Sequence, residues 1–250
     1  MLLSKIGVFE VCPSSKAFYD SLDNHLAASE KCGYFVCMNS YSYAVALSDQ
    51  YFLDATYGAD WIIPDGMILG LASCLSETKI EDRITGYDVF EHLLATSEKE
   101  NKSIFLLGSS DENLMALEEK LGREYPGVTI AGSHSPPFRD HFSEAENLDM
   151  VDRVNTSGAD ILFVSMSAPK QEKWIYVNQS RLNVSLCCPI GAVFDFYTGR
   201  VQRSHKWFRD HGLEWLPRLL QEPRRLGPRY LSVPIFFFNV IKENIKGRFQ

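Results

Sequence analysis

The segment SIFLLGSSDENLMALEEKLGREYPGVTIA, residues 103–131, decides the fold class. It opens with a short apolar run typical of a buried strand and passes through Gly108-Ser109-Ser110. It then carries apolar residues at the spacing of an amphipathic helix. A second short apolar run, residues 128–131, follows. A strand, a helix and a strand in this order predict a unit whose two strands lie parallel in one sheet.

The same alternation extends on both sides of that segment. Because the strand-like runs are apolar throughout, both faces of the sheet must be covered. We therefore expect an α/β fold with a Rossmann-like parallel sheet and helices on both faces. The expected strands are residues 33–38, 59–63, 103–107, 128–131, 160–164 and 184–188. The expected helices are residues 40–55, 66–75, 87–99, 111–124, 143–155, 169–178 and 212–222.

Charge divides the chain near residue 200. The chain has 250 residues, of which 45% are hydrophobic and 23% charged, as in ordinary globular proteins. Residues 1–199 hold 14 basic and 28 acidic side chains, whereas residues 200–250 hold 11 basic and 4 acidic ones. We expect an α/β domain over 1–199 and a basic, aromatic appendage over 200–250. No apolar run has the length of about 18 residues that a membrane span needs.

The loops after the expected strands are the expected binding site. In an open parallel sheet, ligands bind beyond the carboxyl ends of the strands. Glycine and serine before a helix offer backbone N–H groups to an anion such as a nucleotide diphosphate. The alternative is that these glycines only turn the chain. The sequence has no G-x-G-x-x-G after its first strand and no P-loop motif, so neither a dehydrogenase nor a P-loop kinase is indicated.

Asp65 and Asn39 are the polar residues of greatest interest in these loops. Asp65 stands between Pro64 and Gly66, where a carboxylate has the fixed position that a general base requires. The alternative is a helix N-cap. Asn39 ends the expected strand 33–38 and either binds a ligand or caps the following helix.

Two cations in these loops are candidates for phosphate contact. Arg83 could bind phosphate, but next to Glu81 and Asp82 it could equally form a surface ion pair. Pro169 suits the first position of a helix, which puts Lys170 in the first turn. A cation there opposes the helix dipole and suggests a compensating anion, with a solvated first turn as the alternative.

Taken in order, these residues resemble the WecG/TagA/CpsF family of bacterial glycosyltransferases. The resemblance spans about residues 33–230. It departs from the family pattern at Cys37, where threonine is common, at Ser167, where glycine is common, and at Ser204-His205. The matching pieces are Asn39, Pro64-Asp65-Gly66, Arg83–Gly86, Phe105–Gly108, Pro136–Phe138, Ala168–Glu172, Ile190–Asp195 and the segment GLEWLPRLLQEPRRL at 212–226.

The resemblance implies an enzyme that moves a sugar from a UDP-sugar to a sugar on a polyprenyl diphosphate. The reaction would invert the anomeric centre and use no metal or cofactor, at the inner face of the cell membrane. The products would be exopolysaccharide, capsule, teichoic acid or common antigen. The catalytic base falls on Asp65. The implied substrate-binding residues are Asn39, Cys37, Arg83, Gly108, Lys170, Gln171 and Gly191. Arg218, Arg224 and Arg225 are implied to bind the lipid diphosphate of the acceptor.

The expected partners follow from this reading. They are a UDP-sugar, a polyprenyl-diphosphate-linked acceptor and an anionic membrane surface. The sequence leaves open whether the protein forms a homo-oligomer. Phe236, Phe237, Phe238 and Ile241 would lie in the membrane interface or, alternatively, pack on the protein. The alternative function is a non-catalytic scaffold that binds nucleotide sugars. A nucleic-acid binder is disfavoured because residues 1–199 are strongly acidic and carry no such motif.

Overall fold

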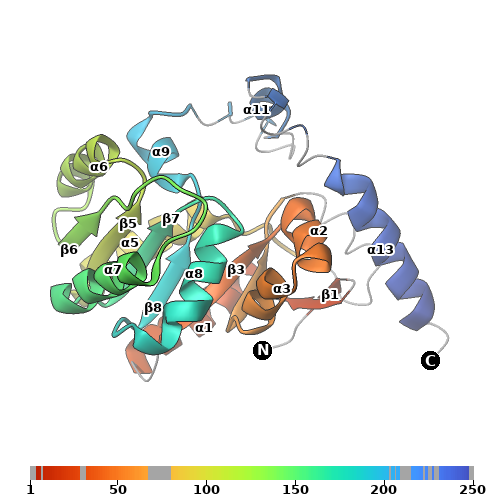
Figure 1. Cartoon of the computed structure of the whole chain (residues 1–250), viewed down its shortest axis with the longest axis horizontal. Helices are drawn as coiled ribbons and strands as arrows, with labels where there is room; N and C mark the ends of the chain where they lie inside the picture. Colours follow the sequence, from red (N-terminus) through yellow and green to blue (C-terminus); the bar gives the residue numbers. More distant parts are fainter. Residues whose placement is uncertain are drawn as a thin grey trace.

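A computed structural model shows a six-stranded parallel sheet between two layers of helices, with a short antiparallel hairpin beside it (Figure 1). The α/β fold expected from the sequence is therefore confirmed. The structure describes residues 4–6, 8–28, 32–66, 80–202, 204–205, 207–208, 215–221, 223–224, 227 and 231–247.

The main sheet has the strand order β4-β3-β8-β7-β5-β6, and every neighbouring pair is parallel. Each strand expected from the sequence is present: the strand at 33–38 has the expected ends, and the ends of the others shift by at most three residues. The strands are β3 (Gly33–Met38), β4 (Trp61–Pro64), β5 (Ser103–Gly108), β6 (Thr129–His134), β7 (Ile161–Ser165) and β8 (Leu186–Pro189).

Two apolar cores cover the two faces of the sheet. Along β3, Tyr34 and Val36 point into one core and Phe35 into the other, as the alternation of a strand requires. The first core is closed by α2 (Ser40–Ser48), α3 (Gln50–Tyr57), α7 (Glu144–Ser157), α8 (Lys170–Asn178) and α13 (Ser232–Gly247). The second is closed by α1 (Ser15–Ala28), α5 (Gly86–Glu100), α6 (Asp111–Glu124) and α9 (Val193–Thr198).

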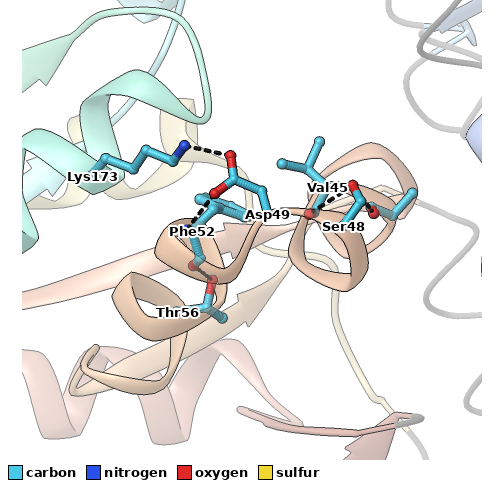
Figure 2. Close-up of polar contacts among 7 residues, drawn as sticks. Val45, Ser48, Asp49, Phe52, Thr56 and Lys173 are labelled. Carbon is cyan, nitrogen blue, oxygen red and sulfur yellow. Dashed lines mark hydrogen bonds and ion pairs between the residues drawn. The ribbon is translucent and has the colours of Figure 1, made fainter.

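The single helix expected over residues 40–55 is in fact two helices that meet at Asp49 (Figure 2). Asp49 adopts an extended conformation, and its Oδ1 accepts the backbone N–H of Phe52 over 3.1 Å. Aspartate favours such local bonds to the backbone over a helix interior, which explains the break. The ammonium group of Lys173 on α8 forms an ion pair with the other carboxylate oxygen.

Helix starts were predicted with mixed success. The helix expected over residues 143–155 is α7, and Ser143 caps it and forms a capping box with Glu146. The expectation that Pro169 is the first helical residue is wrong by one position. Pro169 has φ −91° and ψ 8°, so it caps α8, which begins at Lys170.

Several elements were not expected from the sequence. The strands β1 (Ser4–Ile6) and β2 (Phe9–Val11) form a hairpin, and the helices α1 and α9 were likewise not expected. Gln179–Arg181 forms one further turn, a 3-10 helix (η1). The helix expected over residues 66–75 lies outside the described residues from residue 67 on.

The chain after residue 200 contains α11 (Trp215–Gln221), which lies within the helix expected over residues 212–222 and has Pro217 in its first turn, and α13. Helix α13 packs against α2 (Figure 1). Phe236 is buried, with its ring centroid 5.0 Å from that of Tyr43, so it packs on the protein. Phe238 and Ile241 are exposed. The domain boundary near residue 200 stays a prediction.

Candidate active site

The chain leaves the sheet on opposite faces at two neighbouring strands, β3 and β8. The helix after β3 is α2, which packs in the first core, and the helix after β8 is α9, which packs in the second. Such a switch point opens a crevice at the carboxyl ends of the strands, where α/β proteins bind ligands. Asn39 follows β3 and Gly191 follows β8, so these residues stand at the switch point.

Asp65 is fixed next to Asn39 at this edge of the sheet. Met38 and Pro64 are register partners, and the backbone N–H of Asp65 donates to the carbonyl oxygen of Met38 over 2.8 Å. Asn39 is the N-cap of α2, and its Oδ1 accepts the N–H of Ser42 over 3.0 Å. Asn39 therefore caps α2 through its side-chain oxygen, which was one of the two roles expected for it. The hydrogen bond to Ser42 does not involve the amide NH₂ group of Asn39.

Arg83 is tied to the same edge of the sheet by a hydrogen bond of the next residue's backbone. The N–H of Ile84 donates to the carbonyl oxygen of Pro64 over 3.1 Å, one residue before Asp65. Asp82, which precedes Arg83, accepts hydrogen bonds from Ser15 Oγ and N at 2.7 and 3.2 Å. Arg83 itself is half-buried.

Gln171 joins the loops that follow β7 and β8. Its side chain is buried, and Oε1 accepts the backbone N–H of Gly191 over 3.1 Å and that of Met166 over 3.3 Å. Its Nε2 donates to Oε1 of Glu172 over 2.8 Å. Ser165 adds a further link, because its hydroxyl donates to the carbonyl oxygen of Gly191 over 2.5 Å.

Glu172 is a buried carboxyl in the first turn of α8. It is 1% exposed, and burial raises its pKa to about 7. Its Oε2 has no hydrogen-bond partner among the residues that the structure describes. The Gln-Glu pair at a helix start after a strand was the available signal, but sequence alone does not reveal that the second residue points inward.

Cys37 interacts electrostatically with the carboxyls of both Asp65 and Glu172. Burial raises the pKa of its thiol well above the ordinary value, and the charges of Asp65 and then Glu172 raise it further. Its Sγ lies 3.9 Å from the carbonyl oxygen of Pro189 at the end of β8. The thiol is therefore protonated at neutral pH and acts as a small neutral side chain.

Five of the implied site positions thus lie at or after the carboxyl ends of β4, β3, β7 and β8: Asp65, Asn39, Cys37, Gln171 and Gly191. Comparison with known proteins identifies the class of enzyme. The profile of the "Glycosyl transferase WecG/TagA/CpsF family" matches residues 6–250. The chain belongs to this family. It is therefore a glycosyltransferase.

Named relatives of this WecG/TagA/CpsF enzyme agree in their description. A protein of Bacillus subtilis (strain 168) is 30% identical over 227 residues, which cover 91% of this chain and 86% of the relative. A protein of Staphylococcus aureus (strain MW2) is 27% identical over 201 residues, covering 80% and 76%. Both are named N-acetylglucosaminyldiphosphoundecaprenol N-acetyl-beta-D-mannosaminyltransferase.

Gly108, another implied site residue of this WecG/TagA/CpsF enzyme, lies at the end of β5 and has a structural reason to be glycine. Its φ is +112°, and a Cβ placed on it would lie 2.2 Å from the carbonyl oxygen of Ser165. Glycine therefore allows β5 and β7 to approach at their carboxyl ends. The next residue, Ser109, donates its N–H to the same oxygen over 3.2 Å.

The ammonium group of Lys170 is directed to the loop between β6 and α7. It donates to the carbonyl oxygen of Arg139 over 2.5 Å and lies 3.8 Å from the ring centroid of Phe142. Burial lowers the pKa of Lys170. The cation at the helix start is thus compensated by a carbonyl and an aromatic face, and its contact with a diphosphate stays a prediction.

The C-terminal arginines are only partly covered by the structure. Arg224 is exposed, the backbone of Arg218 belongs to α11, and Arg225 lies outside the described residues. Their implied contact with the lipid diphosphate stays a prediction.

The residues that the structure describes hold no cluster of three His, Cys, Asp or Glu side chains able to bind a metal ion. Among the helices in that part of the chain, none combines the length and the apolar character that crossing a bilayer requires.

A polar network behind the loop after β5 was also missed from the sequence. Asn113 on α6 donates to Ser109 Oγ over 2.8 Å and to Asp195 Oδ1 over 3.1 Å. Thr198 donates to Asn113 Oδ1 over 2.6 Å. The network fixes the loop after β5 against α9, and its members are far apart in sequence.

Proposed function

We propose that the enzyme transfers a hexose or hexosamine-type sugar from a UDP-sugar to a sugar on a polyprenyl diphosphate, with inversion and without a metal. The product would enter a cell-surface polysaccharide such as teichoic acid, capsule, exopolysaccharide or common antigen. The observation that carries the proposal is Asp65, a carboxylate held by its own backbone beside Asn39 at the switch point of a WecG/TagA/CpsF fold. N-acetylmannosamine is the first sugar to test, because it appears in the names of the relatives.

In the proposed reaction, Asp65 takes the proton from the acceptor hydroxyl as that oxygen attacks C1 of the donor sugar. The bond from C1 to the diphosphate oxygen breaks on the opposite face, and UDP leaves with the electron pair. Arg83 and the backbone N–H groups at the helix starts would stabilise the charge that develops on the leaving group. Binding of the donor would involve Asn39, Cys37, Gln171 and Gly191, with Gly108 and Lys170 further along the edge.

The appendage would bring the enzyme to its lipid acceptor at the inner face of the membrane. Basic residues attract anionic lipid with about 1 kcal/mol each near the surface. The described part of α13 and the residue before it expose Leu231, Ile235, Phe238 and Ile241, which suit the membrane interface. Arg218, Arg224 and Arg225 would then meet the diphosphate of the acceptor.

The test is UDP release from a panel of UDP-sugars with a short-chain polyprenyl-diphosphate-linked N-acetylglucosamine, with and without EDTA. We expect EDTA-resistant release with one donor. Asp65→Ala should lower kcat by about 10²–10⁴ if Asp65 is the base. Glu112→Ala, which removes an exposed carboxylate on α6, is the matched control. A loss below about threefold in folded Asp65→Ala would exclude the role as base.

A further inference from the structure

Glu172 is a buried ionisable group that the proposed reaction does not use. Its Oε1 accepts a hydrogen bond from Gln171, and its Oε2 has no partner among the described residues. An ionised carboxylate in such a place would lack the hydrogen bonds that stabilise a buried charge. The side chain is therefore held in a position that favours its neutral form.

The charged and titratable groups around Glu172 do not offset this burial. The thiol of Cys37 on β3 interacts electrostatically with Glu172, and it also interacts with Asp65, with Cys188 on β8 and with Asp88 on α5. Lys173, the next residue after Glu172, pairs with Asp49 at the junction of α2 and α3. Within the described ranges, no cation forms an ion pair with Glu172.

Glu172 is the hydrogen-bond acceptor for the amide NH₂ group of Gln171. Two backbone N–H groups, of Met166 and Gly191, need an acceptor, and only the Oε1 of the amide can supply it. The NH₂ group must then point away from them and needs an acceptor of its own, which Glu172 provides. Without Glu172, the buried NH₂ group would lose its partner.

We propose that Glu172 is a positioning residue that acts in its neutral form: through Gln171 it fixes the loops after β7 and β8, against which the donor diphosphate binds. The inference rests on the proposed function for the identity of the donor. The neutral form matters because a second carboxylate charge near Asp65 and Cys37 would repel the diphosphate.

The test compares wild type with Glu172→Gln and Glu172→Ala from pH 6 to 8.5, by donor KM and kcat. Glutamine keeps an oxygen for Gln171 and places an NH₂ group where a neutral acid carries its proton. We expect Glu172→Ala to lose at least about tenfold in kcat/KM at pH 6, and Glu172→Gln to stay within about threefold of wild type. By pH 8.5, the donor KM of wild type should rise by about tenfold relative to Glu172→Gln, because most of the wild-type protein is then ionised.

A second readout does not depend on turnover. In ¹⁵N-glycine-labelled protein, the Gly191 amide signal should shift with a midpoint near pH 7 in wild type and should not shift there in Glu172→Gln. If no donor is turned over, the proposed function fails, and this titration alone decides the inference. A KM ratio independent of pH, or a Gly191 signal that titrates equally in both proteins, would overturn it.

Discussion

The ammonium group of Lys173 on α8 forms an ion pair with the carboxylate of Asp49, the residue at which α2 ends and α3 begins (Figure 2). Helix α8 carries Gln171 and Glu172, and α2 starts next to Asn39. The pair therefore fixes two sides of the candidate site to each other. Burial acts to raise the pKa of Asp49, but hydrogen bonds from Lys173 and from backbone N–H groups outweigh it and lower the pKa.

Lys173→Met should lower the free energy of unfolding by about 1 kcal/mol at pH 7. Both side chains are less than a third exposed, at 24% and 30%, so solvent screens the pair only in part. Because folding lowers the pKa of Asp49, the contribution is present above pH of about 4 and is lost as the pH falls below it. Urea unfolding at pH 7 and pH 3 measures the difference. Lys16→Met, which removes an exposed lysine, should change stability by less than about 0.5 kcal/mol.

Gly108→Ala should destabilise the enzyme by at least about 2 kcal/mol, because the new Cβ collides with the carbonyl oxygen of Ser165 and the backbone is left-handed. Gly122→Ala is the matched control. Gly122 lies within α6, and nothing lies within 4 Å of the place that a Cβ would occupy there, so alanine should stabilise by up to about 1 kcal/mol. Thermal unfolding of both variants measures the contrast, and equal stability would contradict the close approach of β5 and β7.

Glu172→Gln should alter the pH dependence of stability. Burial raises the pKa of Glu172 from 4.5 to about 7, so the folded protein keeps a proton that the unfolded chain releases. The stability that this provides is complete below pH of about 4.5 and is lost as the pH rises through 7. Relative to wild type, the glutamine variant should gain roughly 2–3 kcal/mol between pH 5 and pH 8.5. Chemical unfolding at the two pH values tests this, and a constant difference would mean that Glu172 titrates normally.

Phe236→Ala should cost about 3–4 kcal/mol, because it empties a buried site against Tyr43 on α2. Phe238→Ala, two residues along the same helix, removes a ring that is 69% exposed and should cost less than about 0.5 kcal/mol. For binding to lipid vesicles we expect the opposite order. Phe238→Ala should weaken binding more than Phe236→Ala, because Phe238 is the ring available to a membrane. Similar losses of stability in both variants would show that α13 packs differently.

The sequence was informative where local pattern and burial agree. The strands around residues 33–38 and 103–108 are short apolar runs, and the helix over 111–124 is strongly amphipathic, so pattern alone located them. Prediction from the sequence failed where local hydrogen bonds override the apolar pattern, as at Asp49. The site followed the same rule: the position of Asp65 follows from the end of a strand, whereas the inward direction of Glu172 depends on packing between helices and strands distant in sequence.

The contact between α13 and α2 has a consequence for how the enzyme opens. Asn39 caps α2, Tyr43 lies one turn further on, and Phe236 on α13 completes the packing around Tyr43. Neither helix can detach without exposing the apolar surface of the other, so in amide hydrogen exchange the two should behave as one cooperative unit. The last helix of the described chain and the first loop of the candidate site then share a single opening free energy, although almost 200 residues of sequence separate them.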